Sequence, residues 1–315
     1  MIPALTIAIP TYNRLGTLFL ALDDLVPLVD EGLVSALVIV DGSSDGTYER
    51  IQSYARQGME IVQNDGNQGY AATFCRIIRE CDTEWVLVSA DDDRIDRSRL
   101  PELQQWLQSE RPDFVSTQWR TVDDVLYRGR RLSGAINPKE LRPAAGHAPG
   151  LVYRVEAARS ALPVLEVHLR EGSSAAIAYP QVLVAAQLMA AGRASWWAGA
   201  VVREGSALPS GLSDAAGRSY WVPESRVSQV VDFDRFFAQG HAAAPDRRSR
   251  QLFRRWRRIN GVALYPAIQT LVREAAPSVD DEWLDAGVRR FLRRKRWKQS
   301  IMGVPGVRSV LDRRR

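Results

Sequence analysis

The sequence predicts an α/β fold in which a mostly parallel sheet is flanked by helices. Two observations carry this prediction. Over the first hundred residues, short apolar runs of strand length alternate with segments whose apolar residues recur at helical spacing. Each apolar run ends in glycine and polar residues, a composition typical of tight connections. Alternation of this kind indicates right-handed crossovers between parallel strands.

The first two strand–helix units lie within residues 5–56. An apolar run over 5–9 is followed by a polar loop and then by a helical pattern through 15–25. A second run over 37–40 ends at Asp41 and a turn rich in glycine and serine, after which residues 47–56 can form a helix. The first of these loops consists of Pro10, Thr11, Tyr12, Asn13 and Arg14.

Two further units complete the pattern. A run over 59–62 leads to a polar loop over 64–69 and a helical pattern over 70–80. A fourth run over 85–88 comes shortly before three consecutive aspartates, Asp91, Asp92 and Asp93. In open parallel sheets the ligand site lies beyond the carboxyl ends of the strands. We therefore expect all four polar loops to meet at one crevice.

The three aspartates need a partner for their charge. Adjacent carboxylates repel one another where a strand leaves the core, unless a divalent cation or a solvated turn takes up the charge. The alternative to a cation site is a helix-capping turn before a helix expected over 98–108. Taken alone, the aspartates leave both interpretations open.

Beyond residue 105 the strand–helix pattern loosens. Residues 125–150 are rich in Arg, Gly and Pro and are typical of a long loop that closes over an active site. A helix is expected over 182–191, and an aromatic strand over 195–202. We expect one of its two tryptophans to be buried and the other exposed, because successive residues of a strand face opposite sides. A sugar-stacking platform is the alternative role for the aromatic residues of this half, Trp196, Trp197, Tyr220 and Trp221.

The composition is that of a soluble globular protein, with 45% hydrophobic residues. No apolar stretch approaches the roughly 18 to 20 residues of a membrane span. The N-terminus lacks the basic and apolar regions of a signal peptide. Cys75 and Cys81 are the only cysteines, which argues against a disulfide framework or a zinc cluster. We therefore expect a cytoplasmic protein.

The charge is distributed unevenly along the chain. Residues 242–315 hold 19 Lys and Arg against 7 Asp and Glu, a net charge of about +12, which leaves about −7 for the rest. Apolar residues such as Phe253 and Trp256 recur at helical spacing among these arginines. The helices are therefore expected either to lie peripherally on the inner face of an anionic membrane or to dock on the protein's own domain. No nucleic-acid-binding motif accompanies the arginines, so no nucleic-acid partner is expected.

Four motifs, taken together, resemble one known family. They are IPTYNR at Ile9–Arg14, VDGSSDGT at Val40–Thr47, NQG at Asn67–Gly69 and SADDD at Ser89–Asp93. In this order and spacing they are similar to those of the family 2 glycosyltransferases, of surface-polysaccharide type. The resemblance is strong over about residues 4–105, weak to about residue 205, and absent from the basic tail.

The resemblance implies the GT-A fold, a Rossmann-like, mostly parallel sheet flanked by helices. We assign this domain to residues 1–235, with a nucleotide-binding half over 1–105 and an acceptor half over 106–235. A basic helical C-terminal region over 236–315 follows the domain. The enzyme class that it implies is a glycosyltransferase.

The resemblance also implies the residues that bind a nucleotide sugar: Pro10, Thr11, Tyr12, Arg14, Asp41, Ser43, Asn67, Gly69 and Asp91. A carboxylate such as Asp41 can accept the imide N–H of uracil or thymine, which favours a UDP- or dTDP-linked donor. Without the other motifs, Asp41 would be interpreted as an Asx-turn that opens the following loop. In the acidic triplet, Asp92 and Asp93 correspond to ligands of a divalent cation, Mg²⁺ or Mn²⁺.

The general base departs from the family pattern. Family members usually carry an acidic pair at the start of a helix, about eleven residues before a glycine. Counting back from Gly192 places Pro180 and Gln181 there, and glutamine has no basic site. The base is therefore assigned to Glu171, with Asp214 and then Glu204 as the next candidates. The histidines His147 and His168 are expected to be packing or surface residues.

The predicted function is a metal-dependent transferase that moves a sugar to a hydroxyl of a lipid-linked surface glycan, with inversion. A nucleotide-sugar-forming nucleotidyltransferase is one alternative, although it needs a Gly-rich phosphate loop and only Gly16 lies near the first strand. A catalytically degenerate transferase that acts as a scaffold is the other alternative, because of Gln181.

Overall fold

The computed structural model describes residues 4–205 and 223–260 of the 315-residue chain. The chain divides into two compact units, Met1–Ser219 and Tyr220–Arg315, which are described separately. The domain boundary expected near residue 235 falls inside helix α9 (Pro223–Ala243) of the second unit. No helix among the described residues is both long enough and apolar enough to span a membrane.

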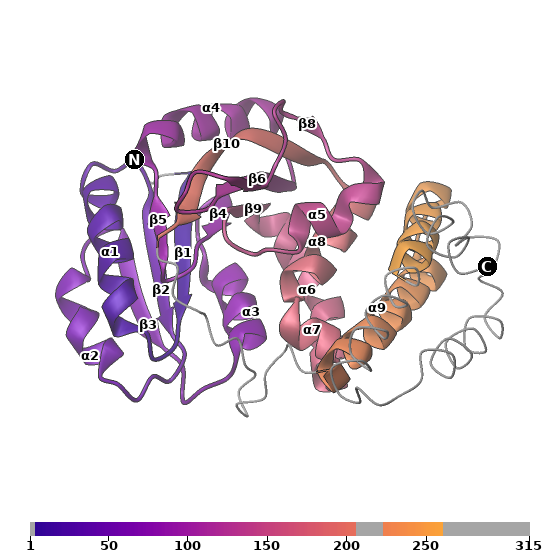
Figure 1. Cartoon of the computed structure of the whole chain (residues 1–315), viewed down its shortest axis with the longest axis horizontal. Helices are drawn as coiled ribbons and strands as arrows, with labels where there is room; N and C mark the ends of the chain where they lie inside the picture. Colours follow the sequence, from indigo (N-terminus) through magenta and orange to yellow (C-terminus); the bar gives the residue numbers. More distant parts are fainter. Residues whose placement is uncertain (1–3, 206–222, 261–315) are drawn as a thin grey trace. The chain divides into compact units, whose positions relative to one another are not determined.

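One mixed sheet forms the centre of the first unit (Figure 1). The strand order is β3-β2-β1-β4-β9-β6-β10-β5, with β7 beside β6 and β8 beside β10. The strands are β1 (Leu5–Thr11), β2 (Ser35–Val40), β3 (Met59–Gln63), β4 (Trp85–Val88), β5 (Asp93–Ile95), β6 (Phe114–Arg120), β7 (Leu126–Arg128), β8 (Gly134–Ala135), β9 (Leu151–Arg154) and β10 (Ala194–Glu204).

The sheet is parallel where the sequence pattern is regular and mixed beyond it. Strands β1 to β4 pair in parallel with one another. Strand β9 then enters antiparallel to both β4 and β6, whereas β6 and β10 are parallel. Strand β5 closes the order antiparallel to β10. The expected mostly parallel sheet is confirmed, with antiparallel strands in the second half.

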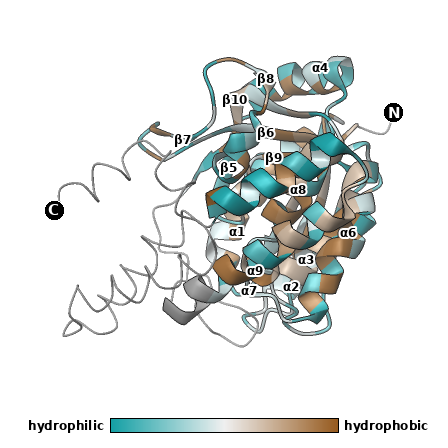
Figure 2. Ribbon diagram, turned by 90° about the vertical axis from the view of Figure 1, so that its right-hand side faces the viewer, coloured by the Kyte–Doolittle hydropathy of each residue, from teal (hydrophilic) through white to brown (hydrophobic). Residues whose placement is uncertain are grey.

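Helices cover both faces of this sheet (Figure 1). Side chains at helical spacing on α1, among them Leu18, Leu22 and Leu25, share a buried cluster with Ile7 and Ile9 of β1. The helices are α1 (Leu15–Asp30), α2 (Thr47–Ile51), α3 (Tyr70–Glu80), α4 (Leu100–Glu110), α5 (Leu141–Ala145), α6 (Val155–Arg170), α7 (Ser174–Ala178) and α8 (Pro180–Ala191). Figure 2 shows α4 in mixed teal and brown, because one side of this helix faces solvent.

Several predicted elements differ in detail from the observed ones. The helix expected over 47–56 is α2, which gives way to a 3-10 helix over Gln52–Tyr54. The segment over 125–150, interpreted as a loop, contains β7, β8, α5 and a 3-10 helix. Its ordered elements form because its short strands find partners in β6 and β10, which a local pattern cannot reveal.

The expectation of one buried and one exposed tryptophan on β10 is wrong. Trp196 and Trp197 are both buried, because both faces of this strand are covered. The indole N–H of Trp196 donates to Glu140 at 3.2 Å. On the other face, the guanidinium of Arg99 lies 5.4 Å from the ring centroid of Trp197. Neither ring is free to serve as an open stacking platform.

The described part of the second unit consists of α9 and a helix over 247–260. Aromatic rings join the two helices: Phe237 lies 6.0 Å from Trp256, and Phe236 lies 6.1 Å from Phe253, between ring centroids. Asp234 of α9 pairs with both Nε and Nη2 of Arg257, at 2.9 and 3.0 Å. The apolar residues between the arginines therefore pack against their own unit.

Candidate active site

The candidate site lies at the carboxyl ends of β1 and β4. These strands are adjacent and parallel, with Ala8 paired to Val88. Thr11 and Asp91 each lie three residues beyond this pair, so the register brings both side chains to the same edge of the sheet. The Thr11 hydroxyl donates to Oδ2 of Asp91 at 2.7 Å, in a buried environment. Sheet register thus places an anion where the two loops meet.

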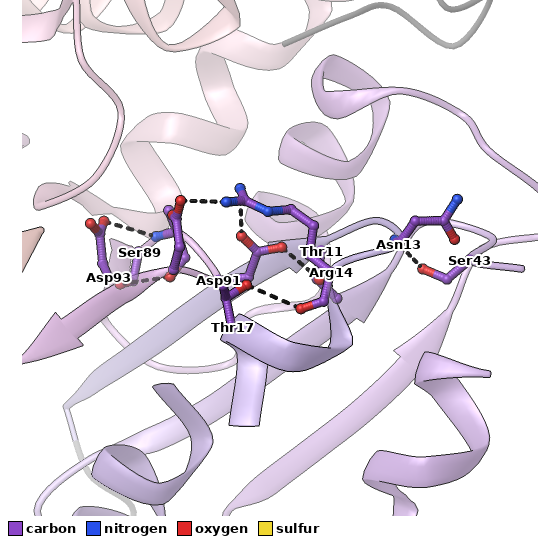
Figure 3. Close-up of polar contacts among 10 residues, drawn as sticks. Thr11, Asn13, Arg14, Thr17, Ser43, Ser89, Asp91 and Asp93 are labelled. Atoms are coloured by element: carbon purple, nitrogen blue, oxygen red, sulfur yellow. Dashed lines mark hydrogen bonds and ion pairs between the residues drawn. The ribbon is translucent and has the colours of Figure 1, made fainter. Parts of the chain in front are cut away.

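Arg14, at the start of α1, links two of the three aspartates (Figure 3). Its Nη1 lies 3.0 Å from Oδ1 of Asp91, and its Nη2 donates to Oδ2 of Asp92. The exposed fractions of the side chains rise outward, from 5% for Asp91 through 16% for Asp92 to 29% for Arg14. The guanidinium therefore covers a buried carboxylate and a nearly buried one.

Burial and neighbouring charges shift the pKa values of the residues in this cluster. Burial raises the pKa of Asp91 to about 6, against the opposing effects of Arg14 and the bond from Thr11. Burial alone would lower the pKa of Arg14, but the carboxylates of Asp91 and Asp92 together raise it. The perturbation is typical of functional sites, where opposite charges are held at short range.

Asp93 lies in a different environment from its two neighbours. Its carboxylate accepts a hydrogen bond from the backbone N–H of Ala90 at 3.3 Å instead of facing Arg14 (Figure 3). Burial, reinforced by the charge of Asp92, raises the pKa of Asp93 to about 8. Asp93 also begins β5, where it pairs in register with Glu204 of β10. The acidic triplet thus does not converge on one point.

Asp41 holds the loop that precedes α3. Its Oδ1 accepts from Nδ2 of Asn64 at 2.6 Å and from the backbone N–H of Gln68 at 2.9 Å. Its Oδ2 accepts from the backbone N–H of Gly69 at 2.8 Å. These partners lie outside the turn that follows Asp41, so the Asx-turn interpretation does not describe it. The carboxylate instead fixes the third polar loop against the second.

Two hydrogen bonds and one close approach of backbones bring three loops together. The backbone N–H of Asn13 donates to Oγ of Ser43 at 2.9 Å, and Oδ1 of Asn13 accepts from the backbone N–H of Ser44 at 2.8 Å. Gly42 has φ +64°, and a Cβ there would lie 2.1 Å from the carbonyl carbon of Gly66. Only glycine permits this approach. The polar loops after the first three strands thus contact one another.

Other residues implied for nucleotide binding lie on the same loops. Tyr12 is 42% exposed, so its ring can offer a flat face to a base. Oδ1 of Asn67 accepts from the backbone N–H of Gly69 at 2.9 Å, where α3 begins. Pro10 lies at the end of β1. The structure thus keeps these residues at the edge where Asp91 lies.

The candidates for the base are separated from one another. Gln181 is buried in the first turn of α8, and its Oε1 accepts no hydrogen bond from any described residue. Glu171 is exposed in the turn after α6, and the ion pairs of Arg14 among the described residues are with Asp91 and Asp92. Glu204 lies beside Asp93 through the β5–β10 pairing, and its Oε2 accepts from the backbone N–H of Val122 at 3.0 Å. Asp214 lies outside the described residues, as do Tyr220 and Trp221.

A buried arginine, Arg128, lies close enough to Asp93 to be influenced by its charge, and it was not anticipated from the sequence. Arg128 of β7 donates to the carbonyl oxygens of Thr117, His147 and Pro149, at 3.1, 2.5 and 2.6 Å. Burial lowers its pKa to about 10. The ring of His147 lies 4.4 Å from that of Trp119, and burial together with Arg128 lowers the pKa of His147 to about 3. His147 is therefore a neutral packing residue. The only feature of the sequence that could have drawn attention to Arg128 is the surrounding run of Arg, Gly and Pro.

The carboxylate oxygens of the aspartates after β4 suit a hard divalent cation that is bound by few protein ligands. Mg²⁺ is usually held by one or two carboxylates together with substrate phosphates. Asp92, whose side chain is more exposed than that of Asp91, is suited to supply one such carboxylate. No group of three or more His, Cys, Asp or Glu side chains within residues 4–205 and 223–260 is arranged to hold a metal ion. The residues fit a cation that is shared with a phosphate-bearing ligand rather than a closed protein site.

Comparisons with known proteins agree with this geometry. Residues 6–158 match the model of the family described as Glycosyl transferase family 2. A comparison with curated protein sequences gives no match. Among solved structures, the chain is similar to S. aureus TarS 1-349 in complex with UDP-GlcNAc, with TM-score 0.58 and 13% identity over 94% of this chain and 79% of that chain.

Two further solved structures share the fold. A longer S. aureus TarS gives TM-score 0.60 and 15% identity over 90% of this chain and 50% of that chain. The mannosyltransferase PcManGT from Pyrobaculum calidifontis, in complex with GDP-Man and Mn²⁺, gives TM-score 0.52 and 18% identity over 94% of this chain and 82% of that chain. Residues 6–158 are therefore similar to glycosyl transferase family 2, and the chain has the GT-A fold of these glycosyltransferases.

Proposed function

We propose that this enzyme transfers a sugar from a UDP- or dTDP-linked donor, with a divalent cation, to a hydroxyl of a lipid-linked glycan in surface-polysaccharide synthesis. One observation supports the proposal above all. Thr11, Arg14, Asp91 and Asp92 meet at the carboxyl ends of two adjacent parallel strands, where such sheets bind their ligands.

Each loop has a role in this proposal. Tyr12 and Asp41 bind the base, and Asp91, held by Thr11, accepts a hydrogen bond from the ribose. Asp92 holds Mg²⁺ or Mn²⁺, with Asp93 as a second or water-mediated ligand once its proton is lost. When bound, the cation neutralises the charge that develops on the departing nucleoside diphosphate. Ser43, Asn67 and Gly69 shape the crevice around the donor.

The nucleotide is the first point to test. TarS was solved with UDP-GlcNAc and with UDP, and the mannosyltransferase with GDP-Man and Mn²⁺. We would incubate the protein with UDP-, dTDP- and GDP-linked sugars, each with Mn²⁺, Mg²⁺ or EDTA, and measure the released nucleoside diphosphate. Cation-dependent release of UDP or dTDP is expected. Release of GDP alone would overturn the nucleotide assignment, and pyrophosphate release from a nucleoside triphosphate and a sugar phosphate would favour the nucleotidyltransferase alternative.

The base is proposed among three acids. Inversion requires a group that removes the proton from the acceptor hydroxyl on the face opposite the leaving group. Glu171 and Asp214 are the candidates from the sequence, and Glu204 is the one that the strand pairing brings beside Asp93. Single replacements by Gln or Asn should identify it. The variant that lacks the base should lose about 100-fold or more in turnover while it still binds UDP, and full activity in all three would favour the scaffold alternative or another mechanism.

Contact with a membrane is proposed to be electrostatic. Phe253 and Trp256 are buried, so these two apolar residues are not available for insertion into a membrane. Its exposed arginines remain: Arg247, Arg248, Arg250, Arg254 and Arg258. Sedimentation with anionic vesicles should decline steeply as salt rises, because such contacts are screened. Absence of binding at low salt would overturn both the membrane contact and the proposed location at the inner face of the cell membrane.

A further inference from the structure

Arg14 is the counter-ion of the acidic edge, by which we mean Asp91 and Asp92 at the carboxyl end of β4. Among the described residues, the ion pairs of Asp91 and Asp92 come from this one guanidinium. No further hydrogen bond of the guanidinium to any described residue is present, so the two carboxylates alone hold it in place. The backbone of Arg14 is fixed separately, because its carbonyl oxygen accepts from Oγ1 of Thr17 and from the N–H of Leu18.

A guanidinium and a divalent cation cannot share these oxygens. Arg14 engages Oδ1 of Asp91 and Oδ2 of Asp92, and Asp92 is the carboxylate proposed to hold the cation. Two positive groups on one carboxylate pair repel each other at short range. The guanidinium must therefore leave Asp92 when a cation binds there.

Arg14 is able to make this exchange. Its side chain is 29% exposed, and it extends from the N-cap position of α1, where the backbone does not need to move. A diphosphate offers the freed guanidinium oxygens in the planar, bidentate geometry that arginine prefers. The nucleotide thus supplies a new partner for the charge that the cation displaces.

We propose that Arg14 occupies the cation position of the acidic edge until metal and nucleoside diphosphate arrive together, so that this residue makes metal binding depend on nucleotide. The inference rests on the proposed function and adds to it a positioning role for Arg14, which keeps the empty edge neutralised. It predicts that the metal alone binds weakly because it must compete with an internal cation.

The test is Mn²⁺ binding without a sugar donor, followed by the electron paramagnetic resonance signal of free Mn²⁺. Wild-type protein, Arg14→Gln and Arg14→Lys are titrated with and without UDP. Arg14→Gln should bind Mn²⁺ alone about tenfold more tightly than wild type, because the competing charge is gone. Its gain in Mn²⁺ affinity on adding UDP should be smaller than in wild type. Arg14→Lys, which keeps the charge but cannot bridge both carboxylates, should bind Mn²⁺ with intermediate affinity.

Arg97→Gln is the matched control, since Arg97 pairs with Glu31 in an exposed ion pair away from the edge. It should behave as wild type in every titration. Circular dichroism establishes that each variant is folded, and Arg14→Lys tests the competition if Arg14→Gln is not. Unchanged or weaker Mn²⁺ binding by these variants overturns the inference, as does a lack of measurable binding by all of them. Sugar transfer by wild type in the donor panel would at the same time leave the proposed function standing.

Discussion

The two halves of the first unit that we propose to bind the nucleotide and the acceptor hold some of their buried polar side chains in different ways. In residues 4–105, the buried carboxylates of the candidate site bond to groups of another loop, as Asp41 does with Asn64 and Gly69. In residues 106–205, the buried guanidinium of Arg128 bonds only to carbonyl oxygens. There, Oε1 of Gln181 and Nδ1 of His147 find no hydrogen-bond partner among the described residues.

This difference separates a preorganised edge from a region whose polar groups are only partly satisfied. A fully paired network is rigid. Removal of any member leaves the other polar groups buried without a hydrogen-bond partner, which costs free energy. A buried atom without a partner already carries that cost, so its removal should be tolerated or even stabilising. Substitutions in the nucleotide half should therefore lose function or stability, whereas some in the acceptor half should not.

The largest effect is expected at Asp92. Asp92→Asn keeps the shape of the side chain but removes the charge that would attract a divalent cation. We expect turnover to decline by about a thousandfold, because the cation supplies several kcal/mol of stabilisation to the leaving diphosphate. Release of the nucleoside diphosphate measures it. The control is Asp123→Asn, which changes an exposed acid in the turn before β7 and should retain activity. Equal activity in both variants would refute a catalytic cation at Asp92.

A smaller effect, on stability, is expected at Asp41. Asp41→Asn leaves one oxygen for three donors and turns an amide N–H toward others. We expect the free energy of unfolding to decrease by about 2 to 3 kcal/mol, the range for a lost hydrogen bond to a buried charged group. Urea unfolding measures this change. Asp65→Asn, an exposed acid of the same loop, should change it by less than about 0.5 kcal/mol, and a similar loss in both variants would contradict the network.

The sequence was most informative where local pattern and spatial neighbourhood coincide. Strands β1 to β4 and their loops follow one another along the chain and pair in parallel, so the motifs around Thr11, Asp41 and Asp91 could be assigned to one edge in advance. The exchange of bonds between loops could not be assigned, because it depends on side-chain directions. Asp41 bonding to Gly69 is one example.

The acceptor half shows why the remainder could not be predicted. Strand β10 pairs with β6, β8 and β5, all distant from it in sequence, so the burial of both Trp196 and Trp197 is a tertiary effect. The same pairing brings Glu204 beside Asp93, a proximity without a local signal. Short strands such as β7 form only because a longer strand offers them hydrogen bonds.

A pH-dependent effect is expected in the acceptor half at His147. Its pKa is lowered to about 3 in the folded state, below the ordinary value of 6.5 that applies to the unfolded chain. Below about pH 6.5 only the unfolded state gains the proton, so stability decreases as pH declines toward 3. His147→Phe keeps a ring against Trp119 and cannot titrate. Between pH 7.5 and 5, wild type should lose about 1 to 2 kcal/mol more than the variant in urea unfolding; parallel curves would contradict the neutral, enclosed histidine.

The smallest effect, and the clearest contrast with Asp41, is expected at Gln181. Gln181→Met conserves the length and volume of the side chain and removes a buried carbonyl oxygen that no described residue satisfies. The free energy of unfolding should stay unchanged or rise by about 1 kcal/mol, since an unmet desolvation cost disappears. Turnover should be retained, because an amide cannot act as the base. A clear loss of turnover with normal stability would instead show that Gln181 contacts the substrate, and the acceptor half would then be as preorganised as the nucleotide half.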